Sequence, residues 1–201
     1  MHTCTHCLHA MLLKIHPKNI FRKTLEEYAQ TVKIAHDEVV RATALLLMDT
    51  ERIRKLRPEF NYYPTCPDAD IVRQVSRHAD VSAVSFLLID REVEALEVLK
   101  DDQWFKVPII PHAIVVLVGD QIEMMSNGIL KSPEHRVKPD LEKERISMAL
   151  FCSPDLEKEV GPLKALVTED QPPFYTTAKS YINLFERHYT KGIRPITAVK
   201  I

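Results

Sequence analysis

The sequence predicts a mainly β domain, a sandwich or jelly roll, with a helix before it and a helix after it in the chain. Between residues 58 and 154, short runs of valine, isoleucine, leucine and phenylalanine alternate with turn signals such as KDDQ, PIIPH and SNG. Several short strands at such close spacing are typical of a sandwich or jelly roll. On both sides of this region, apolar residues recur at helical spacing instead.

The first 16 residues contain Cys4 and Cys7 in a C-x-x-C arrangement among several histidines. These are the ligand types of a zinc site, but no second ligand pair follows at a known spacing. We therefore predict a disordered leader over residues 1–16, without zinc. The 4 cysteines of the chain are too few and too scattered for a disulfide scaffold, so we expect free thiols.

Residues 17–57 are predicted to form a long helix followed by a linker. Apolar residues at helical spacing mark one face of this helix between Pro17 and Met48: Phe21, Leu25, Tyr28, Val32, Ala35, Val39 and Leu46. The segment DTERIRKLR, residues 49–57, is charged and ends at Pro58, which indicates a solvated linker.

Residues 58–154 carry the predicted strands, and no helix is apparent among them. The strands are expected at 60–63, 75–78, 84–89, 96–99, 105–107, 114–118, 135–137 and 146–151. Their apolar side chains should form the core or the inner wall of the domain, and the candidates are Phe86, Leu88, Val116, Met148 and Leu150. The remaining part, residues 155–201, is predicted to hold a C-terminal helix over 176–189 and a tail, because Gly192 and Pro195 end the helical pattern.

Composition favours a small-molecule partner. The net charge of −1 gives no electrostatic reason to expect nucleic acid or an anionic membrane. No apolar run is long enough to span a bilayer, and the first residues lack the basic and apolar parts of a signal peptide. We therefore expect a cytoplasmic protein; the oligomeric state is left open.

The segment VSRHADV places His78 and Asp80 two residues apart in a strand-like run. Side chains at positions i and i+2 of a strand project to the same face, so both can reach one metal ion. His135, which opens a later predicted strand, can supply a third ligand and leave open positions for substrates. Alone, an H-x-D pair more often reflects a surface histidine near an aspartate.

Two further pairs have the same i, i+2 spacing. Arg145 and Ser147 offer a fork of donors to a carboxylate, which fits an acidic co-substrate whose other end reaches the metal. Asn61 and Tyr63 can add donors. Each residue also has a structural interpretation: Arg145 can form a rim salt bridge with nearby glutamates, Ser147 can be an ordinary strand residue, and His135 can be a buried core histidine.

The segments FNYYPTCPD, HAD, DDQWFKVPIIPHAIVVLVGD, MMSNGILKSPEHRV and KERISMALF resemble the successive signatures of the plant-type 2-oxoglutarate- and Fe(II)-dependent dioxygenases. Within that family the chain most resembles the branch of codeine O-demethylase and the norcoclaurine-synthase-like dioxygenases. The resemblance implies a double-stranded β-helix (jelly roll). It also implies the oxidation, by hydroxylation, demethylation or desaturation, of a small specialised metabolite or hormone, with O2 and 2-oxoglutarate as co-substrates.

The same resemblance assigns the site. It implies that His78, Asp80 and His135 hold Fe(II), and that Arg145 and Ser147 bind the far carboxylate of 2-oxoglutarate. Tyr63 and Asn61 would assist, with no catalytic residue beyond the metal centre. Other matching residues are interpreted as packing and turn positions, some of which need positive φ: Trp104, Gly119, Asp120, Asn127 and Gly128.

The resemblance does not extend to the leader, and family members usually carry a longer N-terminal region. We therefore expect an N-terminally shortened chain. Two alternatives to a 2-oxoglutarate-dependent enzyme stay open. One is a non-catalytic jelly-roll remnant. The other is a related Fe(II) oxidase, like aminocyclopropane-carboxylate oxidase or isopenicillin N synthase, which does not consume 2-oxoglutarate.

Overall fold

The computed structural model describes residues 27, 30, 34, 53–65, 77–183, 188 and 193–201, and the chain divides into two compact units, residues 1–50 and 51–201. In the first unit Glu27, Gln30 and Ile34 are helical. The leader and the rest of the helix predicted over 17–48 lie outside the described residues, as do Cys4, Cys7 and Cys66. No helix within the described part is long and apolar enough to cross a membrane.

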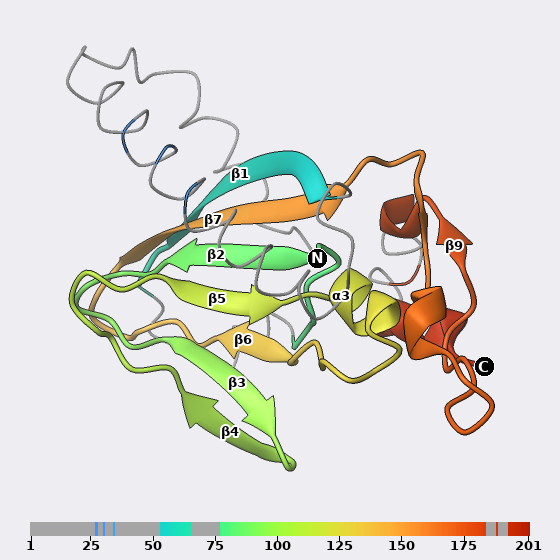
Figure 1. The fold of residues 1–201 in the computed structure, drawn as a ribbon. Helices are drawn as coiled ribbons and strands as arrows, with labels where there is room; N and C mark the ends of the chain where they lie inside the picture. Colours follow the sequence, from blue (N-terminus) through green and yellow to red (C-terminus); the bar gives the residue numbers. More distant parts are fainter. Residues whose placement is uncertain are drawn as a thin grey trace. The chain divides into compact units, whose positions relative to one another are not determined.

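The second unit is mainly β, as predicted, and is built from antiparallel sheets (Figure 1). The larger sheet has the order β1-β7-β2-β5, formed by Ile53–Tyr63, Arg145–Pro154, Val84–Leu88 and Val115–Val118. The smaller sheet has the order β4-β3-β6, formed by Gln103–Lys106, Leu96–Lys100 and His135–Val137. Two short strands, β8 (Glu159–Val160) and β9 (Ala178–Lys179), pair separately.

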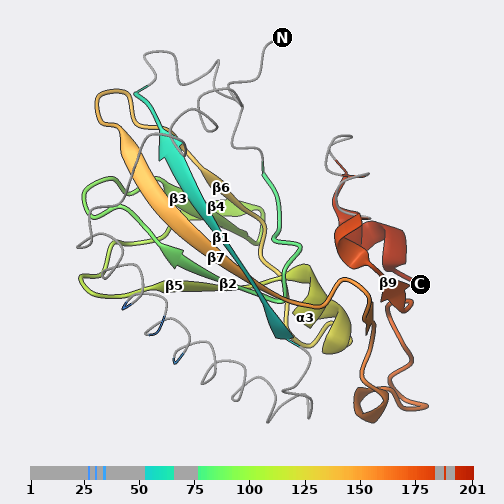
Figure 2. The same cartoon turned by 90° about the horizontal axis from the view of Figure 1, so that it is seen from above.

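Strand β1 begins inside the segment predicted as a linker. It pairs with β7 from Ile53 to Tyr63, and in Figure 2 the two strands run side by side. The linker prediction is therefore wrong for residues 53–57. In the larger sheet β1 is an edge strand, where charged side chains such as Lys55 and Arg57 remain in contact with solvent. For this reason a charged sequence was compatible with a strand.

Helix α3 (Asp120–Met125) lies where no helix was predicted. All 6 of its residues are buried, so no alternation of polar and apolar faces marks it in the sequence. The C-terminal helix also differs from its prediction, because Ala178 and Lys179 form β9 and the helical conformation begins only at Tyr181. Pro195–Val199 form a 3-10 helix, and Lys164–Leu166 form another.

The turn after α3 confirms the prediction for two residues, because Asn127 and Gly128 have φ angles of 50° and 81°. Gly119 is different. Its φ of −99° is open to any residue, but a Cβ at this position would overlap the carbonyl group of Ser82. Glycine is needed here for close packing between the start of α3 and the loop that follows Asp80.

Strand register decides which side chains face the interior. Tyr63 pairs with Arg145, and Leu87 pairs with Val115 and Ala149, so these residues share one face of the larger sheet. Tyr63, Leu87 and Val115 pack on the same apolar cluster as residues of the smaller sheet, so this face is the inner one; the cluster contains Val93, Ala95, Leu96 and Val137.

The five residues predicted for the core or the inner wall lie on the opposite face, because Phe86 pairs with Leu150 and Val116, and Leu88 pairs with Met148. Phe86, Met148 and Leu150 are buried, but Leu88 and Val116 are 38% and 42% exposed. The prediction of a core or wall position is therefore confirmed for Phe86, Met148 and Leu150, which belong to the core, and is wrong for Leu88 and Val116. None of the five lines the site, since successive residues of a strand point to opposite faces.

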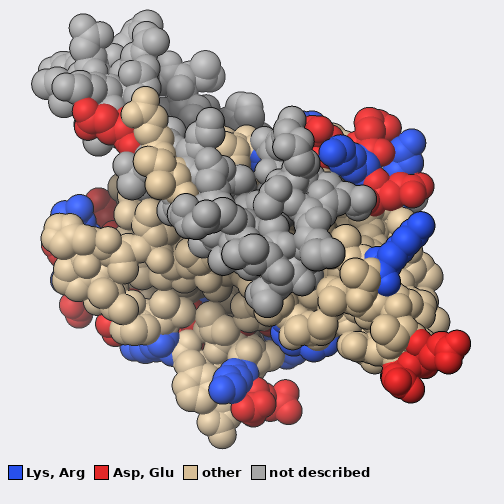
Figure 3. All heavy atoms as spheres, in the orientation of Figure 1, with Lys and Arg blue, Asp and Glu red and all other residues tan. Residues whose placement is uncertain are grey.

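Charged side chains of both signs are interspersed over the described residues on the face shown in Figure 3, in keeping with the net charge of −1. Cys152 is a buried free thiol, as expected, and burial raises its pKa to about 12. Such a thiol is protonated and unreactive at neutral pH.

Candidate metal and 2-oxoglutarate site

The structure brings His78, Asp80 and His135 together. His78 forms an isolated antiparallel bridge with His135, the first residue of β6, through backbone hydrogen bonds of 3.1 and 2.8 Å. Asp80 Oδ1 lies 3.5 Å from His135 Nε2 and 3.8 Å from His78 Nε2. Ala79 and Asp80 are not part of a strand, so strand alternation does not bring the two side chains together; the bridge at His78 and the loop that follows it do. Residues 75 and 76 of the strand predicted at 75–78 lie outside the described residues.

The three side chains fit a divalent metal ion. One possible ligand atom from each lies within 4.8 Å of the others, and Asp80 and His135 are both only 5% exposed. Among the described residues, the buried Asp80 Oδ2 has no hydrogen-bond partner. A buried carboxylate oxygen without a partner calls for an ion or a water molecule. Two histidines and one carboxylate are the ligand set typical of non-haem Fe(II) oxygenases.

The environment of His135 favours the form that binds a metal. Burial lowers the pKa of its imidazole, and the negative charge of Asp80 only partly opposes this. Its Nδ1 lies 3.3 Å from the carbonyl oxygen of Pro133, which can only accept a hydrogen bond. Nδ1 therefore carries the proton, and the lone pair of Nε2 is directed towards Asp80 and His78.

The second group of predicted residues lies on the paired strands β1 and β7. Tyr63 is opposite Arg145 and Asn61 is opposite Ser147, so all four belong to the inner face. Arg145 Nη1 donates to Ser147 Oγ over 3.2 Å, and the guanidinium lies 4.9 Å from the centre of the Tyr63 ring. Asn61, Tyr63 and Ser147 are partly buried.

Arg145 is a buried cation in need of an anion. It is 2% exposed, and within the described part of the chain no ion pair joins it to a carboxylate. Nε of Arg145 also has no hydrogen-bond partner among the described residues. Burial lowers the pKa of its guanidinium and raises the pKa of the Tyr63 phenol beside it. The described residues show no ion pair between Arg145 and Glu142 or Glu144, and the exposed Glu144 carboxylate accepts from Tyr62 over 2.9 Å.

Both groups face the same interior. Val137 lies two residues after His135 in β6, so both point to the same side of the smaller sheet. Val137 belongs to the apolar cluster against which Tyr63 packs from the larger sheet. The metal ligands and the buried arginine thus lie on the two walls of one interior.

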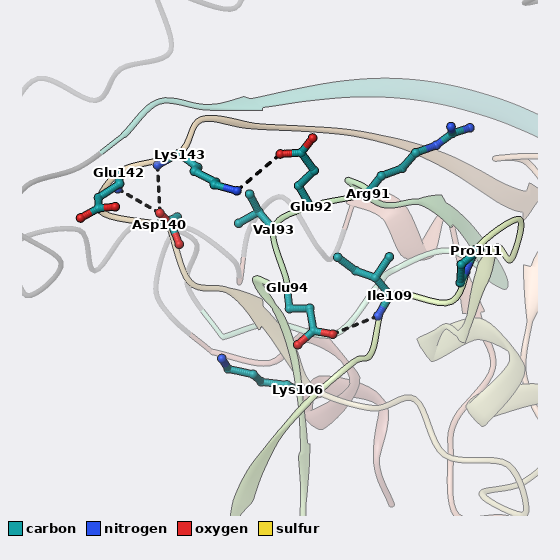
Figure 4. Close-up of a pocket in the computed structure, with 10 residues that line it drawn as sticks. All are labelled: Arg91, Glu92, Val93, Glu94, Lys106, Ile109, Pro111, Asp140, Glu142 and Lys143. Carbon is teal, nitrogen blue, oxygen red and sulfur yellow. Dashed lines mark hydrogen bonds and ion pairs between the residues drawn. The ribbon is translucent and has the colours of Figure 1, made fainter.

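A separate cleft of about 610 Å³ contains none of the predicted site residues (Figure 4). It is lined by Arg91, Glu92, Val93, Glu94, Lys106, Ile109, Pro111, Asp140, Glu142 and Lys143. Several of its charged groups are already satisfied: Lys143 pairs with Glu92 at 3.4 Å, and Asp140 accepts two backbone hydrogen bonds of 2.9 Å. Nothing in this lining indicates a ligand.

Sequence reasoning missed the role of helix α3 next to the metal ligands. Gln121 and Glu123 are 2% and 3% exposed and hydrogen-bond to the loops that carry Asp80 and His135. In the sequence, Gln121 and Glu123 stand between apolar residues, which is a weak signal of a function. Because buried polar groups are normally hydrogen-bonded, this pattern indicates that the two side chains have specific partners.

Two histidines and one carboxylate that converge at one point within antiparallel sheets are typical of a non-haem Fe(II) oxygenase fold. The profile of the 2OG-Fe(II) oxygenase superfamily matches residues 59–154. Flavonol synthase 1 of Crocosmia x crocosmiiflora is 42% identical over 168 residues, 79% of this chain and 50% of the relative. Codeine O-demethylase of Papaver somniferum is 36% identical over 163 residues, 77% and 45% of the two chains.

Among solved structures, JOX2 in complex with 2OG, Fe and JA superposes with a TM-score of 0.79 at 28% identity, covering 100% of this chain and 63% of that one. These matches support the plant-type 2OG-Fe(II) oxygenases as the family of the chain. The chain spans about half the length of the curated relatives that it matches. Relatives of the flavonol synthase and codeine O-demethylase types both match, so these identities do not single out the predicted branch.

Proposed function

We propose that the chain holds Fe(II) and 2-oxoglutarate and uses O2 to oxidise a small molecule. The observation that carries this proposal is the set of His78, Asp80 and His135, in which Asp80 and His135 are buried and one Asp80 oxygen has no hydrogen-bond partner among the described residues. This set faces the same interior as the buried Arg145. A metal and an anion would each satisfy a buried polar atom that has no hydrogen-bond partner among the described residues, Asp80 Oδ2 and Arg145 Nε.

In this proposal His78, Asp80 and His135 hold Fe(II), which together with 2-oxoglutarate and O2 supplies the oxidant that attacks a C–H bond. Arg145 and Ser147 bind the far carboxylate of 2-oxoglutarate through hydrogen bonds from the guanidinium and the hydroxyl to the charged oxygens. Tyr63 packs against the guanidinium, and Asn61, opposite Ser147, supplies a further donor. The apolar cluster around Val137 keeps bulk water out of the interior.

The proposed substrate is a specialised metabolite or hormone. Relatives carry the names flavonol synthase, codeine O-demethylase and jasmonate-induced oxygenase, and they support oxidation of small organic molecules as a class. We retain hydroxylation, demethylation and desaturation as outcomes of the same chemistry. A cytoplasmic location remains part of this proposal.

The test is anaerobic addition of Fe(II) and then 2-oxoglutarate to the purified chain, with the visible metal-to-ligand charge-transfer band as readout. We expect the band in the unaltered chain and its loss in Asp80→Ala. Glu97→Ala is the matched control, because Glu97 is also a buried carboxylate but pairs with Arg136 at 2.7 Å outside the site.

Each outcome separates the alternatives. A folded chain that binds no Fe(II) would be a non-catalytic jelly roll. Fe(II) binding without a charge-transfer band, and no succinate when O2 is admitted, would indicate an oxidase that does not use 2-oxoglutarate. A band that survives in Asp80→Ala would contradict the assigned metal site.

A further inference from the structure

Helix α3 contacts the loop that carries the metal ligand Asp80. The backbone N–H of Asp120 donates to the carbonyl oxygen of Asp80 over 2.8 Å. Gln121 donates from its side chain to the carbonyl oxygen of Val81 over 2.8 Å and from its backbone to Ser82 over 3.3 Å. The start of α3 therefore fixes the backbone at and just after Asp80.

The same helix contacts the loop that carries His135. Oε2 of Glu123 accepts from the backbone N–H of Ser132 over 2.7 Å, and Arg194 donates to the carbonyl oxygen of Ser132 over 2.9 Å. Arg194 also donates to Glu123 Oε2 over 3.3 Å. Ser132 is thus held at both backbone groups, one residue before Pro133, whose carbonyl oxygen orients the His135 ring.

The C-terminal segment supplies the other partners of these carboxylates, and in Figures 1 and 2 it lies beside α3. Asp120 accepts from Arg194 over 3.0 Å and from Tyr181 over 2.9 Å, and Glu123 accepts from Tyr175 over 2.7 Å. Asp120 is 0% exposed. Burial acts to lower the pKa of the Arg194 guanidinium, but the charges of Asp120 and Glu123 outweigh it and raise the pKa.

We propose that Arg194 and Glu123 are positioning residues for the metal ligand His135, so that docking of the C-terminal segment completes the geometry of the metal site. This inference rests on the proposed metal site. The path is short: Arg194 and Glu123 hold Ser132, and the loop from Ser132 through Pro133 sets the position and ring orientation of His135. The opposing view is that the network only stabilises the fold.

Two variants separate these views. Arg194→Met removes the contact with the His135 loop as well as the contact with Asp120. Tyr181→Phe is the matched control, because it removes a hydrogen bond to the same buried Asp120 but none to Ser132. Arg194→Lys keeps the charge and can restore part of the contact.

The measurement is anaerobic titration of the full chain with Co(II), followed by its ligand-field absorption spectrum, with thermal unfolding of the metal-free chains recorded alongside. We expect Co(II) affinity about tenfold weaker in Arg194→Met, with an altered spectrum, as for other residues that orient metal ligands. Tyr181→Phe should keep the affinity and spectrum of the unaltered chain, and Arg194→Lys should lie between the two.

Equal Co(II) affinity and spectra in Arg194→Met and the unaltered chain would overturn the inference, whatever the change in stability. So would an equal loss of affinity in Tyr181→Phe, which would reveal a purely structural network. If Arg194→Met does not fold, the same Co(II) titration is made on Arg194→Lys and Glu123→Gln. Unchanged Co(II) affinity in both of these variants would overturn the inference. A folded, unaltered chain that binds no metal would instead overturn the proposed function, and this inference with it.

Discussion

Two of the three metal ligands, His78 and Asp80, are held by a different kind of structure from the proposed 2-oxoglutarate residues, whereas His135 opens strand β6. Arg145, Ser147 and Tyr63 lie on β1 and β7, two strands paired along their length. His78 belongs to an isolated bridge, and Asp80 lies in a loop. Strand pairing places a side chain through many repeated hydrogen bonds, whereas a loop depends on the neighbours that hold it.

This difference shows where the site is vulnerable. A substitution on β1 or β7 changes one side chain of a regular ladder, and we expect its effect to remain local. A change behind the Asp80 loop, at α3, can move a ligand without touching it. Five predictions test this comparison, from the largest expected effect to the smallest.

Removal of a ligand should have the largest effect. His135→Ala is expected to weaken Fe(II) binding by more than about 100-fold, because even residues that only orient ligands contribute about 10 to 100-fold. Anaerobic metal titration measures this. His112→Ala is the control, because His112 is exposed and lies outside the site; loss of binding in that variant instead would contradict the assignment.

On the strand side, Arg145→Ala should raise the dissociation constant of 2-oxoglutarate by at least about 30-fold, since loss of one partner of a buried charge pair costs about 2 kcal/mol or more. Fe(II) affinity should be unchanged, because Arg145 lies on a separate, paired strand. Titration of the Fe(II)-loaded chain with 2-oxoglutarate checks both, with exposed Arg91→Ala as control. An unchanged requirement for 2-oxoglutarate would remove Arg145 from the site.

On the loop side, Gly119→Ala should destabilise the chain by about 1 to 3 kcal/mol, the usual cost of forced overpacking. The added methyl group meets the carbonyl group of Ser82, so relief of the overlap must shift α3 away from the loop that follows Asp80. Thermal unfolding and Fe(II) titration should therefore both change. If Gly119→Ala has the stability and the Fe(II) affinity of the unaltered chain, the prediction is contradicted, and the loop that follows Asp80 tolerates movement.

Ser147→Ala should cost about 1.5 kcal/mol of 2-oxoglutarate binding, a roughly tenfold weaker affinity, because it removes one hydrogen bond from a hydroxyl to the charged carboxylate. The hydroxyl also accepts from Arg145 over 3.2 Å, so the guanidinium loses a partner. The same 2-oxoglutarate titration measures this effect. A loss as large as that in Arg145→Ala would show that the two residues act as one unit.

The smallest expected effect is on pH dependence. Burial lowers the pKa of His135 in the folded chain below its ordinary value of 6.5. Between pH 6.5 and the lower pKa of the folded chain, His135 is protonated in the unfolded chain but not in the folded chain. The free energy of unfolding therefore decreases as the pH falls through this range to the folded pKa. Unfolding free energies of the metal-free chain between pH 7 and pH 5 should decline less in His135→Asn; an identical decline would exclude this residue as a cause.

The sequence predicted the site residues on β1 and β7 more directly than helix α3 and its contacts with the loops of the metal ligands. Alternation in a strand is a local property, so the i, i+2 spacing of Arg145 with Ser147, and of Asn61 with Tyr63, was enough to predict that each pair shares a face. The same rule did not show which face lines the site: Phe86, Met148 and Leu150 are core residues on the opposite face of the sheet, and Leu88 and Val116 are exposed there. It was also applied to His78 and Asp80, which do converge, but for a different reason.

The sequence by itself determined the mainly β architecture, most strand positions, and the two groups of candidate site residues, because each depends on short spacings or on family motifs within one segment. Only the tertiary structure decided that β1 starts at Ile53 and that α3 forms from buried residues. It alone also showed that Glu123 and Arg194, 71 positions apart, meet at the loop of His135. Contacts between distant segments arise from packing, which no local pattern encodes.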